Sequence, residues 1–125
     1  MNFLSLLPIT YTMITIFHNP KCRKSRAGID YLKERNIPHE VVEYLKSPLS
    51  RWNLKDILMK LNISPLELVR TQEDVFIDKF KGKNFTDEEW IDILLEYPRL
   101  IRRPIAMKGY RAVIAQPPEE IEKLL

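Results

Sequence analysis

The sequence has few of the residues that form covalent or metal cross-links. Its 125 residues include a single cysteine, Cys22, and only two histidines, His18 and His39. One cysteine excludes an intramolecular disulfide and a cysteine-rich metal site, and the two histidines lack the spacing of zinc ligands. We therefore expect no metal, and a reducing compartment, most simply the cytoplasm.

Long runs of one charge are also missing. The formal net charge is +3, and the basic residues are interspersed with glutamate and aspartate. A DNA-binding protein more often carries a continuous basic stripe, whereas a modest positive charge suits a small anionic substrate. The composition, 45% hydrophobic and 30% charged, is typical of a globular protein that binds no nucleic acid.

The first seventeen residues contain no lysine, arginine, aspartate or glutamate. A secretory signal peptide needs a basic start and a small-residue cleavage site, and neither is present. Pro8 interrupts an apolar run that is shorter than the roughly 20 residues of a transmembrane helix. We expect residues 1–12 to be an extension outside the core fold that does not bind a membrane, with Met13 as an alternative start. Residues 13–125 are then one domain.

Hydrophobic patterns and turn residues predict an α/β chain. Two short apolar runs flank a helical pattern, which predicts a βαβ unit with parallel strands and a right-handed crossover. Ser50, Ser64 and Thr86 are placed to begin helices, so residues 50–97 form a helical block. The expected elements are strands at 13–17 and 39–45, a helix at 21–35, a hairpin at 104–107 and 110–114 with its turn at Lys108–Gly109, and a last helix from Pro117 that buries Ile121, Leu124 and Leu125.

Cys22 lies where the first strand passes into the first helix. Free backbone N–H groups at a helix N-terminus stabilise a thiolate and can hold an oxyanion. Ser25 lies three residues later, where its hydroxyl can donate to the sulfur, and Arg26 follows one helical turn after Cys22. A free cysteine is more often a small buried hydrophobe, but these polar neighbours disfavour that interpretation.

Arginines also occur at two distant positions in the chain. Arg70 ends a helix of the helical block, and Arg103 precedes Pro104 at the entry to the hairpin. The planar guanidinium fork binds tetrahedral oxyanions, and an X-Pro bond at a strand start is a candidate for the cis form. The spacing alone does not show that these arginines converge on Cys22; they are equally well interpreted as ordinary surface charges.

Six segments occur in an order that resembles the arsenate reductase family of the thioredoxin-like fold, the glutaredoxin-linked class. They cover nearly all of residues 13–125, so the ordered set is more specific than any one motif. They are ITIFHNPKC (14–22) with Ser25–Arg26, EYLKSP (43–48), LVR (68–70), YPRLI (97–101), RPI (103–105) and PPE (117–119).

The resemblance implies a thioredoxin-like fold, with a mixed four-stranded sheet and a helical insertion at about residues 50–97. It implies Cys22 as nucleophile, Arg70 and Arg103 as oxyanion ligands, and Pro104 as a cis proline. His18 matches a family histidine whose imidazolium favours the thiolate. Asn19 either fixes the loop by hydrogen bonds or is a simple turn residue. An external thiol, glutathione or glutaredoxin, supplies electrons, and no cofactor is bound.

The chain departs from the family pattern at one position. Gln116 stands where arsenate reductases carry a further arginine, so the substrate stays open. One alternative is a non-catalytic regulator of the same fold that binds RNA polymerase; another is a monothiol redox enzyme with a different substrate. Such regulators usually carry Cys-x-x-Cys, and with Ser25 in the second position an intrachain redox switch is impossible.

Overall fold

The computed structural model describes residues 13–125. The extension predicted for residues 1–12 lies outside the described residues. The chain divides into two compact units, which we describe separately. Unit 1 combines the residues up to Glu43 with Arg103–Leu125, and unit 2 is Tyr44–Arg102. The helical block predicted at residues 50–97 lies entirely within unit 2.

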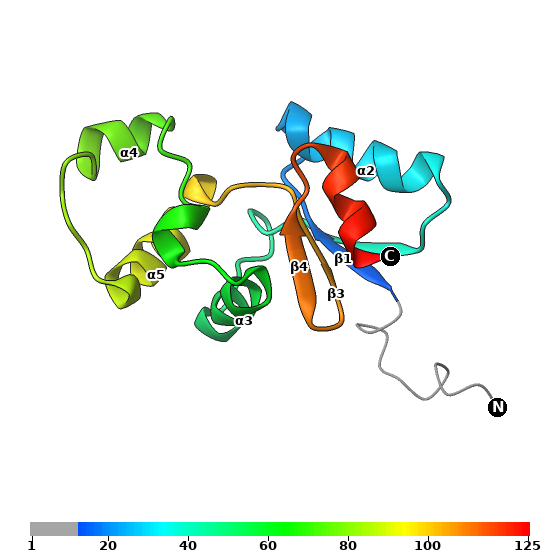
Figure 1. Cartoon of the computed structure of the whole chain (residues 1–125). Helices are drawn as coiled ribbons and strands as arrows, with labels where there is room; N and C mark the ends of the chain where they lie inside the picture. Colours follow the sequence, from blue (N-terminus) through cyan, green and yellow to red (C-terminus); the bar gives the residue numbers. More distant parts are fainter. Residues whose placement is uncertain (1–12) are drawn as a thin grey trace. The chain divides into compact units, whose positions relative to one another are not determined.

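Unit 1 is built on the mixed four-stranded sheet that the sequence predicts. Its strands are β1 (Ile14–Phe17), β2 (His39–Val42), β3 (Ile105–Lys108) and β4 (Arg111–Ile114). The strand order is β2-β1-β3-β4, so β1 lies inside the sheet between β2 and β3. β1 runs parallel to β2 and antiparallel to β3, and β3 pairs with β4 as a hairpin (Figure 1).

The crossover between the parallel strands is helix α2 (Arg23–Glu34). Its buried face includes Ile29 and Leu32, which pack in one core with the fully buried β1 residues Ile14 and Ile16. The C-terminal 3₁₀ helix η4 (Pro118–Leu124) lies against α2 (Figure 1), and the Tyr31 hydroxyl of α2 donates to the Glu122 carboxylate at 2.8 Å.

Two details of unit 1 differ from the prediction. Lys108 pairs with Arg111, so the hairpin turn is Gly109–Tyr110 rather than Lys108–Gly109, and Gly109 supplies the positive φ of 61°. The last helix is 3₁₀ and buries Ile121 and Leu124, but Leu125 is 64% exposed. It follows the end of that helix, where nothing holds it inward.

Gly28 allows α2 to pack closely beside the start of the hairpin. A Cβ at this position would lie 2.8 Å from Pro104 Cγ and 3.3 Å from Ile16 Cδ1. The Arg103–Pro104 bond is cis, as the sequence predicts, and the Gln116–Pro117 bond is also cis. The glycine therefore brings the first turns of α2 close to the segment that carries Arg103.

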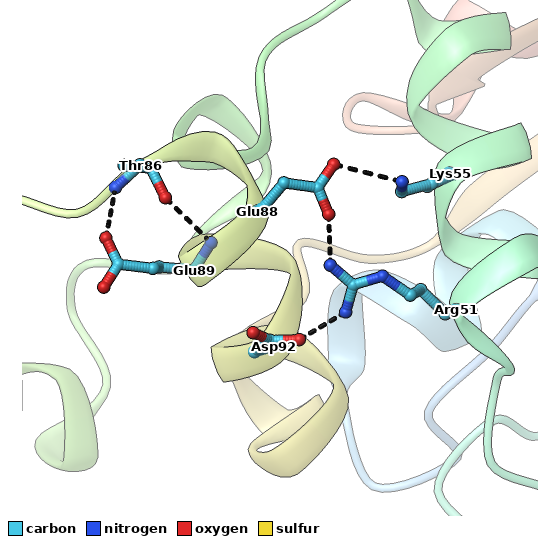
Figure 2. A network of polar contacts seen from close by, with 6 residues as sticks. All are labelled: Arg51, Lys55, Thr86, Glu88, Glu89 and Asp92. Carbon is cyan, nitrogen blue, oxygen red and sulfur yellow. Dashed lines mark hydrogen bonds and ion pairs between the residues drawn. The ribbon is translucent and has the colours of Figure 1, made fainter.

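Unit 2 is helical, and its helix starts agree with the predicted caps. Ser50, Ser64 and Thr86 each form a capping box with the residue three positions later. An ion-pair network joins the two longest helices of this unit: Arg51 of α3 (Arg51–Leu61) contacts Glu88 and Asp92 of α5 (Asp87–Glu96) (Figure 2). The helices are α3 (Arg51–Leu61), η2 (Pro65–Leu68), α4 (Asp74–Lys79), α5 (Asp87–Glu96) and η3 (Pro98–Leu100).

The buried face of α5 consists of Trp90, Ile91 and Leu94. The rings of Phe80 and Phe85 pack edge-on to each other. The ring of Phe85 also packs edge-on to Trp90, with 5.0 Å between the two ring centroids. Within residues 13–125, no helix has both the length and the apolar character needed to cross a bilayer.

We expect Thr86→Ala to destabilise the protein by about 1 kcal/mol, the usual value of a lost N-cap. The Thr86 hydroxyl accepts the Glu89 N–H at 3.2 Å and no other group in the capping box replaces it (Figure 2). Urea unfolding followed by circular dichroism measures the change. Thr86→Ser keeps the acceptor and serves as the control; equal stability of the alanine and serine variants would contradict the assignment.

Candidate functional site

Cys22 is the N-cap residue of α2. Its backbone is extended, with φ −97° and ψ 123°. The Cys22 N–H donates to the Asn19 carbonyl at 3.0 Å, and the Cys22 carbonyl accepts from the Arg26 N–H at 3.0 Å. The backbone is thus held on both sides, and the sulfur lies at the end of the helix where amide N–H groups lack intrahelical partners.

Several groups act on the Cys22 sulfur. Partial burial by itself raises the pKa of the thiol, but hydrogen bonds from the Ser25 backbone and from the Arg103 side chain lower it, with the Arg103 charge and the Lys24 backbone adding to them. The net result is a thiol pKa below its ordinary value. The donors stabilise the negative sulfur, so the thiolate is more populated than in a free cysteine.

A buried polar cluster holds the loop before Cys22. Ser25 is fully buried, and its Oγ accepts the Asn19 N–H at 2.9 Å and lies 2.9 Å from His18 Nδ1. The Asn19 side-chain oxygen accepts the Lys21 N–H at 3.1 Å. Asn19 therefore fixes the loop through its side chain as well as its backbone. The partners of the Ser25 hydroxyl are His18 and Asn19, so Ser25 acts on the sulfur through its backbone N–H rather than through the predicted hydroxyl.

The surroundings of His18 favour the neutral imidazole, whereas the resemblance implies an imidazolium. Its side chain is buried, and burial is the largest influence and lowers its pKa. Glu43 and the contact with Ser25 oppose this change, whereas the charge of Arg26 adds to it, and the net pKa lies below the ordinary value for histidine. His18 therefore supports the site by bonding Ser25.

Arg26 is tied to the loop that precedes the thiol. Its Nη1 donates to the Pro20 carbonyl at 3.0 Å, and the residue is exposed. The sequence places Arg26 one turn above Cys22, and in the structure its guanidinium closes the loop between them.

The two arginines that lie far from Cys22 in the sequence, Arg103 and Arg70, belong to different units. Arg103 is in unit 1 with Cys22 and bonds its sulfur. Arg70 is in unit 2, where its N–H donates to the Leu100 carbonyl at 2.6 Å and its guanidinium pairs with Glu73. The approach of Arg70 to Cys22 stays a prediction. Gln116 is exposed in unit 1, two residues after the end of β4.

With this geometry in place, comparison with known proteins gives the family. The family model described as "ArsC family" matches residues 17–124, which include every residue of the site. The chain belongs to the ArsC family. This confirms the resemblance found in the sequence, and the matched range runs through both units.

Relatives of this ArsC chain match over most of their length. An arsenate reductase of Neisseria meningitidis serogroup A is 36% identical, over 90% of this chain and 97% of its own. The protein YfgD of Escherichia coli K12, which is uncharacterised, is 34% identical over 90% of this chain and 96% of its own. The structure of an arsenate reductase from Vibrio cholerae superposes with a TM-score of 0.85 at 29% identity, covering 91% of this chain and 98% of that one. The fold is thioredoxin-like, as the sequence predicts.

We expect the Cys22 thiol to titrate at a lower pH in the native protein than in the same chain unfolded in urea. Reactivity then rises with pH earlier in the native state, because the thiolate is the reacting form. Iodoacetamide alkylation rates against pH measure this, and the single cysteine makes the signal specific.

Arg103→Gln is expected to move the native midpoint to higher pH and to slow alkylation at neutral pH several-fold, because a donor and a positive charge are lost. Arg111→Gln removes the same charge at the turn end of the hairpin, away from Pro104, and serves as the control. A midpoint unchanged by Arg103→Gln, or moved equally by both variants, would contradict the role assigned to Arg103.

Proposed function

We propose that this chain is a thiol-dependent arsenate reductase whose nucleophile is Cys22. The observation that supports this most directly is the lowered pKa of the Cys22 thiol, which is bonded by backbone amides of α2 and by Arg103. An ionised sulfur next to a guanidinium and free amides combines a nucleophile with donors for an anion. Family membership and relatives named arsenate reductase agree with this chemistry.

In the first step, the Cys22 thiolate attacks the arsenic of arsenate. An S–As bond forms, and one arsenate oxygen leaves as water after taking up a proton. Arg103 and the α2 amides stabilise the negative oxygens, which is the role of an oxyanion hole. Arg70 is the proposed second oxyanion ligand, which requires its guanidinium to serve the anion as well as Glu73.

In the second step, a donor thiol from outside the chain resolves the adduct, since residues 13–125 contain no sulfhydryl besides Cys22. The donor sulfur attacks the Cys22 sulfur, an S–S bond forms and the S–As bond breaks. The electron pair of the S–As bond stays on arsenic, which is thereby reduced. The arsenic leaves as arsenite, and arsenite takes up the proton that the donor thiol has lost. A second donor thiol cleaves the mixed disulfide and restores Cys22. Glutathione or glutaredoxin fills this role, and the reaction needs no bound cofactor and takes place in the cytoplasm.

Cys22→Ser is expected to abolish thiol-dependent formation of arsenite, because a serine hydroxyl is neither ionised near neutral pH nor able to form the disulfide through which arsenic is reduced. Arsenite released from arsenate in the presence of glutathione, with and without glutaredoxin, is the measurement, and circular dichroism checks that the variant folds. Turnover that survives in Cys22→Ser, or native protein that stays inert with every thiol donor, would contradict the proposed function.

Gln116→Arg is expected to raise kcat/KM for arsenate. A charge-assisted hydrogen bond is worth about 1.5–3 kcal/mol, which corresponds to about 10- to 150-fold in rate. Gln116→Met has a similar length without the charge and is the control. If the arginine variant is no faster than the methionine variant, Gln116 does not lie within reach of the oxyanion.

A further inference from the structure

Exposed cations surround the candidate nucleophile. Lys21 precedes Cys22, and Arg23, Lys24 and Arg26 follow it within the first turn of α2; all of them are exposed. We call these four residues the basic collar. The site chemistry described above uses the Lys24 backbone, the Arg26 contact with Pro20 and the effect of the Arg26 charge on His18, and it leaves the charges of Lys21, Arg23 and Lys24 without a role.

The collar opposes the usual electrostatics of a helix. The N-terminus of a helix is its positive end, so carboxylates there are stabilising and cations are unfavourable. Helix α5 follows this rule, with Asp87, Glu88 and Glu89 in its first turn. Helix α2 has no acidic residue in its first turn. A local rule that is broken without a structural gain indicates a functional requirement.

Ion pairs among the described residues do not neutralise the basic collar. Across residues 13–125, the ion pairs of the structure involve neither Lys21 nor Arg23 nor Lys24. Arg26 donates to a carbonyl, which is neutral. The carboxylate that acts within the site is Glu43, and it acts on His18. The rim of the Cys22 site therefore presents a positive field to solvent.

We propose that the basic collar selects the second substrate, a small thiol that carries carboxylates. This inference rests on the proposed function. The arsenic adduct on Cys22 is itself an anion, so it repels a carboxylate-bearing thiol, and the collar reverses the sign of the field that the thiol meets. Fields of this kind raise the rate of association by about 10- to 1000-fold and weaken with salt.

The first experiment measures, without arsenate, how the basic collar affects the rate at which Cys22 reacts with charged and neutral reagents. Cys22 reacts with disulfide reagents of similar type and different charge: dithiobis(nitrobenzoate), an anion, and dithiodipyridine, which is neutral. Both consume the same thiolate, so the ratio of their rates is independent of the thiol pKa. The reagent colour reports Cys22 alone, because it is the only cysteine. The ratio is the rate with the anionic reagent divided by the rate with the neutral one. It is then divided by the same ratio measured for free glutathione.

We expect this ratio to exceed one in low salt and to fall towards one in high salt. Arg23→Gln/Lys24→Gln should lower it at least several-fold in low salt. Lys81→Gln/Lys83→Gln removes two exposed lysines from unit 2 and should leave it unchanged. A ratio near one in the native protein, or equal effects of the two double variants, would overturn the proposal.

The second experiment uses turnover. The KM for glutathione should rise several-fold in Arg23→Gln/Lys24→Gln, whereas the KM for its diethyl ester, which lacks the free carboxylates, should not rise. Equal changes for both thiols would overturn the inference. A protein that shows the charge ratio in the reagent assay but reduces no arsenate would overturn the proposed function instead, so the two failures are distinguishable.

Discussion

The chemistry of this protein depends on the hydrogen bonds that backbone amides of α2 make to the Cys22 sulfur. These amides are available because Cys22 occupies the N-cap position, after which the first amides of the helix have no intrahelical partners. A serine or aspartate there would use its oxygen to satisfy the same donors. Arg103 adds a donor and a charge from the far end of the sequence. Burial alone would favour the neutral thiol, so the site functions only while these donors outweigh it.

The Cys22 loop is held in place by a buried serine rather than by a second thiol. Burying a hydroxyl is unfavourable unless it is hydrogen-bonded, and Ser25 meets this condition with Asn19 and His18. The position that holds the resolving cysteine in a Cys-x-x-Cys protein thus has a structural role here. In the proposed reaction, the donor thiol therefore comes from outside the chain.

The helices of the two units follow different electrostatic rules. In unit 2, the N-terminus of α5 is closed by Thr86 and by acidic residues, and the pairs between Arg51 and α5 add to the contact between α3 and α5. In unit 1, the N-terminus of α2 has no acidic residue in its first turn and is surrounded by exposed cations. The difference agrees with the proposal that the N-terminus of α2 serves a ligand, whereas that of α5 serves local stability.

The sequence by itself determined the features that depend on neighbouring residues. Capping patterns at Ser50 and Thr86 located helix starts, and the alternation of strand and helix around Cys22 located the thiol, because these signals act over a few residues. Pro104 made the bond before it a candidate for the cis form, and the family resemblance implied that form, which the structure has. The hairpin turn was misplaced by one residue because register is set by pairing across strands, which the Lys108–Gly109 dipeptide does not specify.

The tertiary structure alone decided the properties that depend on burial and on long-range approach. Burial lowers the pKa of His18, although the family resemblance implied an imidazolium. Packing directs the Ser25 hydroxyl away from the sulfur and brings Arg103 to it. Desolvation and contact between distant segments arise only when the chain is folded, and no local pattern of residues encodes their balance.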